Sequence, residues 1–126
     1  MIVATIKSYT DIEQSKKLAE ILPLECADMY YHYVTSVKSY HEDVPKYVQV
    51  FNHFVFFHYD IPCWSLAALL NILPDGINVI KDKSDTENEK YMCTVEGTND
   101  IITAFGNNPI DACVAMIERL HELKML

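Results

Sequence analysis

The chain has 126 residues, of which half are hydrophobic and 22% are charged, and its formal net charge is −8. This length and composition are typical of one globular domain and exclude a disordered chain. The acidic balance and the single arginine, Arg119, argue against nucleic-acid binding, because phosphate neutralisation needs clustered basic groups. We therefore expect one soluble domain over residues 1–126 that binds no nucleic acid.

The cysteines and the apolar segments indicate where such a chain resides. The four cysteines contain no Cys-x-x-Cys pair, and the first ten residues lack the basic start and the cleavage site of a signal peptide. The longest nearly uncharged stretch, residues 61–74, is shorter than a bilayer span requires. We predict a cytoplasmic protein with reduced thiols and no membrane partner.

The first part of the chain predicts a helix followed by two strands. Thr10 and Glu13 have the spacing of a capping box, and apolar residues then recur up to a proline, which predicts a helix over 11–22. Residues 29–34 and 47–59 are rich in aromatic and β-branched side chains, which is typical of strands. Large apolar residues alternate onto both faces of the second strand, so we expect it to be central or covered on both sides.

The second part predicts a helix, three strands and a final helix. Asp60 can cap a helix over 61–73 that carries no charge, and such a helix is either buried or part of an oligomer interface. Asn108 and Pro109 have the signature of a third helix start. The order α-β-β-α-β-β-β-α indicates an α+β fold, with three helices packed on a mainly antiparallel sheet of about five strands. The last three strands are predicted at residues 77–80, 91–95 and 101–105.

The sequence contains none of the common catalytic or nucleotide-binding motifs. It has no glycine-rich phosphate loop, no Gly-x-Ser-x-Gly elbow and no His-Glu-x-x-His helix. Cys63 would lie in the first turn of the predicted second helix with His58 nearby, but a buried structural thiol is the simpler interpretation. We assign no catalytic residue and expect no cofactor, and the sequence favours a non-enzymatic protein without deciding the question.

The segment 30–59 holds ten of the fourteen aromatic residues and four of the five histidines. If its two strands pair, His32 could approach His53 or His58, and converging histidines bind zinc or transfer protons. The alternative is an aromatic core with hydrogen-bonded, inert histidines at its edge, which the absence of close ligand spacing favours. These three histidines are the weak candidates for a metal site.

Three blocks of the chain occur in a recognisable combination: DIEQSKKLAEILPLECADMYY at 11–31, IPCWSLAALLNILP at 61–74 and NNPIDACVAMIERLHELKML at 107–126. Together they resemble a family of small uncharacterised proteins from gut-bacterial genomes, often in prophage or mobile-element surroundings. That family offers no activity, cofactor or site residue to carry over. The resemblance implies a bacterial or phage cytoplasmic protein with an accessory role.

The leading interpretation is a non-enzymatic protein-interaction or accessory protein of prophage or mobile-element origin. Its partner would be an unidentified protein, and a second copy of the chain is one such partner. The interface would include Trp64, Leu66 and Leu70. The alternative is a small-molecule or metal-binding protein, or a small enzyme, that uses the histidines and tyrosines of segment 30–59. A structural virion component ranks last, because no fibre repeat or coiled coil occurs.

Overall fold

The α+β class predicted from the sequence is confirmed. The order of helices and strands also follows the prediction, with one short strand, β3, in addition. No helix in the described part of the chain is long and apolar enough to cross a bilayer. The computed structural model describes residues 6–33, 47–52, 60–82, 90–97 and 99–126.

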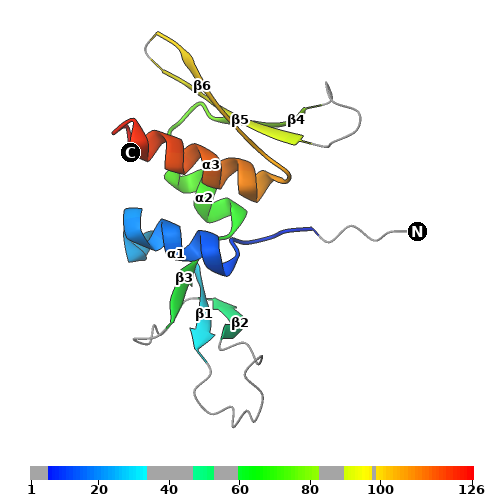
Figure 1. Cartoon of the computed structure of the whole chain (residues 1–126), viewed down its shortest axis with the longest axis vertical. Helices are drawn as coiled ribbons and strands as arrows, with labels where there is room; N and C mark the ends of the chain where they lie inside the picture. The colour runs from blue at the N-terminus through cyan, green and yellow to red at the C-terminus, as the bar shows by residue number, and fades with distance from the viewer. Residues whose placement is uncertain (1–5, 34–46, 53–59, 83–89, 98) are drawn as a thin grey trace, which may run out of the picture.

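The described strands divide between two antiparallel three-stranded sheets, with the helices between them (Figure 1). The first sheet has the order β2-β1-β3, so β1 (Met29–Tyr33) is central between β2 (Tyr47–Asn52) and β3 (Ile61–Cys63). Among the described strands, the one beginning at Tyr47 lies at an edge of its sheet rather than at the centre, and the alternative expectation, that both of its faces are covered, stays a prediction. Residues 53–59 lie outside the described part.

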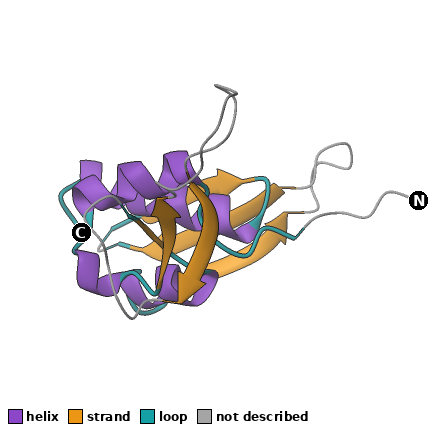
Figure 2. Ribbon diagram, turned by 90° about the horizontal axis from the view of Figure 1, so that it is seen from below, coloured by secondary structure: helices purple, strands orange, loops and turns teal. Residues whose placement is uncertain are grey.

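The second sheet forms the other end of the molecule. It has the order β4-β5-β6, and consecutive strands pair antiparallel, as a meander predicts. One face of this sheet packs on the helices (Figure 1). Seen from below, the first sheet lies nearest the viewer and the helices lie behind it (Figure 2). The strands of the second sheet are β4 (Asn78–Asp82), β5 (Lys90–Glu96) and β6 (Ile101–Gly106).

Helix α3 (Pro109–Glu122) forms the centre of the main core. Its start is as predicted: the Asn108 side chain accepts a hydrogen bond from the Asp111 amide at 2.9 Å, and Pro109 occupies the first turn. Seven of its side chains are buried, so α3 packs at once on the second sheet and on α2 (Leu66–Ile72). A smaller cluster, Tyr31, Ile61 and Cys63, packs between the first sheet and α1 (Ile12–Ile21).

Helix α1 begins one residue later than predicted. Its cap is Asp11, whose carboxylate accepts from the Gln14 amide at 2.8 Å while the Gln14 side chain accepts from the Asp11 amide. Thr10 does not cap the helix, because its hydroxyl accepts the Trp64 amide and shares a hydrogen bond with Ser15.

Helix α2 is shorter than the predicted helix over 61–73. Ile61–Cys63 form β3 instead, with Ile61 opposite Tyr31 and Pro62 opposite Tyr30. Proline is tolerated there because β3 is an edge strand, where one row of amides needs no ladder partner. Ser65, rather than Asp60, caps the helix by accepting from the Ala68 amide.

Candidate functional site

The predicted histidine cluster can be followed only at His32, because His53 and His58 lie outside the described residues. His32 is on β1, and its Nδ1 lies 3.1 Å from Oδ1 of Asp60, whose side chain is fully buried just before β3. The Tyr30 ring approaches the imidazole edge-on, with centroids 6.4 Å apart. The pair thus joins the central strand of the first sheet to the residue that leads into its edge strand.

A buried carboxylate beside an imidazole fixes the ring orientation and its tautomer, as it does behind many metal-bound or catalytic histidines. A complete site also needs further ligands or a nucleophile near the exposed side of the ring. Within the described residues, no group of three or more His, Cys, Asp or Glu side chains is close enough to hold a metal ion. The His32–Asp60 pair alone therefore does not make a complete metal or catalytic site.

Cys63 is not in a helix, contrary to the expectation from sequence. It lies on β3, is completely buried, and its sulfur contacts the Thr10 hydroxyl at 3.6 Å. Burial is the largest effect on this thiol and raises its pKa above the ordinary value. The thiol therefore stays protonated at neutral pH, which is the structural role that the sequence favoured.

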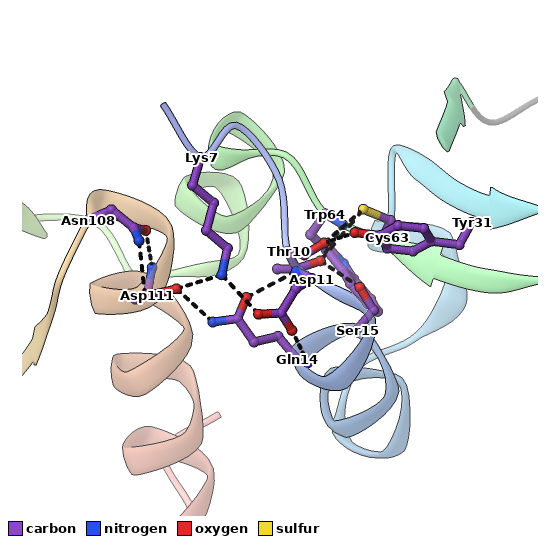
Figure 3. A network of polar contacts seen from close by, with 10 residues as sticks. All are labelled: Lys7, Thr10, Asp11, Gln14, Ser15, Tyr31, Cys63, Trp64, Asn108 and Asp111. Atoms are coloured by element: carbon purple, nitrogen blue, oxygen red, sulfur yellow. Dashed lines mark hydrogen bonds and ion pairs between the residues drawn. The ribbon is translucent and has the colours of Figure 1, made fainter. Parts of the chain in front are cut away.

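A polar network ties the N-terminal segment to both ends of the helical layer (Figure 3). The Lys7 ammonium donates to Asp11 at 3.0 Å and to Asp111 at 2.9 Å, and the Gln14 amide group donates to the same Asp111 oxygen at 2.8 Å. Burial acts to lower the pKa of Lys7, but the two carboxylates outweigh it and raise that pKa. The network therefore clamps α1 to the start of α3.

Beneath this network, Thr10 forms a buried polar centre (Figure 3). Its hydroxyl accepts the Trp64 amide at 3.1 Å and lies 2.7 Å from the Ser15 hydroxyl, and its carbonyl accepts the Tyr31 hydroxyl at 2.7 Å. Burial is also the main reason that the pKa of Tyr31 is raised well above its usual range. Throughout the described residues, no buried side-chain nitrogen or oxygen lacks a hydrogen-bond partner.

A hollow of about 500 Å³ lies beside the network. Two of its polar groups are already engaged: Lys7 is held by two carboxylates, and the Tyr31 hydroxyl is bound to a backbone carbonyl. These two groups therefore have less capacity to orient a ligand, which a binding pocket requires. Its lining residues are Ile6, Lys7, Ser8, Tyr9, Asp11 and Tyr31.

The three residues of the predicted interface have different surroundings. Trp64 is fully buried, and its ring nitrogen donates to the Cys26 sulfur at 3.4 Å. Leu66 is half-buried against the main core, while Leu70 on α2 is 40% exposed. Of these three residues, Leu70 alone is exposed, and the charge-free segment belongs mainly to the core, which was one of its two predicted alternatives.

The sequence reasoning missed the outer face of the second sheet, which points away from α3. Cross-strand pairing places Ile80, Met92 and Phe105 in one row across β4, β5 and β6. Ile80 and Phe105 are 50% and 51% exposed, although both belong to regular strands. The alternation of inward and outward residues along these strands was the available signal. We call the outward residues of β4, β5 and β6 the outer face.

No protein-family model, curated protein or solved structure matches the chain. These comparisons do not test the resemblance to small proteins of gut-bacterial genomes, which stays a prediction.

The outer face has the composition of a contact surface. Beside the apolar row lies a second row of Asn78, Thr94 and Thr103, and Ile101, at the β6 end of the sheet, is 67% exposed. Connected apolar side chains on a regular, open sheet are typical of surfaces that bind other proteins, whereas scattered exposed apolar residues carry no such meaning. No described residue covers this face (Figure 1).

Proposed function

We propose that the protein is a non-enzymatic interaction protein that binds a protein surface through the outer face of the second sheet. The observation that carries the proposal is the row of Ile80, Met92 and Phe105 across three paired strands, in which Met92 is partly buried and the other two side chains are half-exposed. Burying such a row against a partner removes apolar area from water, which favours the complex by about 25 cal/mol for each Å² buried.

The proposal includes a cytoplasmic location and an accessory role in a prophage or mobile element. Four free thiols, three of them buried, support a reducing compartment, because buried pairs of cysteines tend to be oxidised in secreted proteins. The accessory role is supported only by the sequence resemblance.

Site-specific photo-cross-linking tests the proposed function. The photoreactive residue p-benzoylphenylalanine replaces Phe105 in one variant and Leu24 in a matched control, since Leu24 is 41% exposed but lies far from the second sheet. We expect a discrete adduct of one mass from position 105 in living bacterial cells, and none from position 24. The adduct should disappear when Ile80→Asp is added. Equal adducts from both positions, or none from position 105, would refute the proposal.

A second candidate function is small-molecule or metal binding by the segment 30–59. The observation that favours it is the His32–Asp60 pair, in which a buried carboxylate orients a partly exposed imidazole. Native mass spectrometry with added Zn²⁺ tests it. A stoichiometric zinc adduct that His32→Ala abolishes would support this candidate, and an unchanged mass at a micromolar excess of zinc would exclude zinc as the ligand.

A further inference from the structure

The partner that best fits the outer face is a second copy of the same chain. We propose a symmetric, face-to-face dimer in which β5 of one copy runs antiparallel to β5 of the other. This inference rests on the proposed function and adds the identity of the partner and the register of contact. It follows from how charge, side-chain size and area are arranged on the face.

Charge is the first argument. Along β5 the outward residues are Lys90, Met92, Thr94 and Glu96, so the strand is positive at one end and negative at the other. A two-fold axis that crosses β5 at Cys93 reverses the strand direction, and it places Lys90 of each copy over Glu96 of the other. Stacked sheets lie about 10 Å apart, a gap that an extended lysine and an extended glutamate bridge together. The symmetry forms this pair twice.

Side-chain size is the second argument, and it selects the same register. The axis at Cys93 lies between the long row, Ile80–Met92–Phe105, and the short row, Asn78–Thr94–Thr103. Rotation about this axis places the long row of one copy over the short row of the other. Facing layers interdigitate best when large residues meet small ones. A register that stacked the long rows on each other would instead place Lys90 opposite Thr94, and the Lys90–Glu96 pairs between the two copies would be lost.

The area of the face sets the strength of the dimer. Three strands about 4.8 Å apart and about six residues long give a face of roughly 15 by 20 Å. Such a face buries on the order of 500 Å² per copy, or about 1,000 Å² in total, which is at the lower limit for a specific interface. The net charge of −8 on each copy also opposes association. We therefore expect a dimer that dissociates in the micromolar range.

Charge reversal combined with sedimentation equilibrium tests the register. Lys90→Glu and Glu96→Lys should each weaken dimerisation about tenfold, because each turns two attractive pairs into two repulsive ones. The double variant should restore the wild-type dissociation constant to within about threefold. Glu96→Lys is the decisive variant: it reduces the net negative charge from −8 to −6, which by itself would favour association. Glu20→Lys is the matched control, since it makes the same charge change on the exposed side of α1.

The outcomes separate this inference from the proposed function. Phe105→Ser should give a monomer that still unfolds cooperatively in urea, with only a modest fall in the midpoint, because about half of the Phe105 side chain is already exposed. A wild-type chain that stays monomeric at 500 µM, or a Glu96→Lys variant that dimerises more tightly, would overturn the inference. If the chain is monomeric and the photo-cross-link from position 105 carries a different protein, the face binds another partner and the proposed function stands. If no such adduct forms, both fail.

Discussion

Replacing Thr10 by valine should destabilise the fold although it nearly conserves the side-chain volume. Valine keeps the shape but removes the hydroxyl that accepts the Trp64 amide at 3.1 Å and bonds Ser15 at 2.7 Å. An unsatisfied buried amide costs about 1–3 kcal/mol, and the lost hydroxyl pair adds about 1 kcal/mol. We expect Thr10→Val to lower the free energy of unfolding by about 2–4 kcal/mol.

Equilibrium unfolding in urea measures this loss. At a slope of about 2 kcal/mol per molar urea, the midpoint should fall by about 1–2 M with the slope unchanged. Thr10→Ser is the control: it keeps the hydroxyl and removes one methyl group, so it should cost only about 1 kcal/mol. The double variant with Ser15→Ala should cost less than the sum of the single changes. A Thr10→Val midpoint within the error of wild type would refute the role assigned to this hydroxyl.

Three further predictions concern other parts of the molecule. Gly106→Ala should lower the free energy of unfolding by more than about 3 kcal/mol, because a Cβ at this position would lie 2.3 Å from the Ala112 amide nitrogen. Gly76→Ala, where a Cβ meets no atom, should lower it by only about 1–2 kcal/mol because of its φ of +83°. Similar urea midpoints for the two variants would contradict this prediction. Burial acts to raise the pKa of Asp11, but hydrogen bonds from Gln14 and Lys7 lower it overall, so the stability that Asp11 contributes is present above about pH 4 and lost as the pH falls through the depressed folded value. The difference in unfolding free energy between wild type and Asp11→Ala, about 1 kcal/mol at pH 7, should therefore shrink by pH 2–3, and a difference independent of pH would exclude the ionised cap. Of the four thiols, Cys26 alone is not fully buried, so Ellman's reagent should modify one thiol quickly in the native protein and four in denaturant; rapid modification of two or more would show that the core opens readily.

Local signals predicted the parts of the fold whose partners are close in sequence. Asn108 and Pro109 specify the start of α3 because the cap hydrogen bond closes within one turn. The three strands of the second sheet were also predicted, since their inward residues alternate regularly.

Signals that depend on distant partners could not be decided from sequence. Thr10–Glu13 and Asp11–Gln14 have the same capping spacing, and the choice between them depends on the Trp64 amide, 54 residues away from Thr10. Residues 61–63 have the features of a helix start, and only their pairing with β1 makes them a strand.

The candidate surface was hidden for a related reason. Nothing in the sequence marks Ile80, Met92 and Phe105 as a group, because they belong to three separate strands and are far from one another along the chain. Cross-strand register alone gathers them into a row. The predicted interface at Trp64 started from a charge-free segment, which indicates burial rather than exposure. The sequence does not say whether the surface that buries such a segment belongs to the same chain or to a partner.

The clamp formed by Lys7 and Asp111 has a consequence for how the protein folds while it is being synthesised. The two residues are 104 positions apart, and α1 gains its contacts with α3 only when both have been synthesised. At about 5–20 residues per second, Asp111 is added roughly 5–20 s after Lys7. During that interval the nascent helix α1, with the apolar side chains of Leu18 and Leu22, has no α3 to cover it. The contacts of α1 with β3 can form once residues 61–63 have been made, so the clamp to α3 is the last of the contacts that secure this helix.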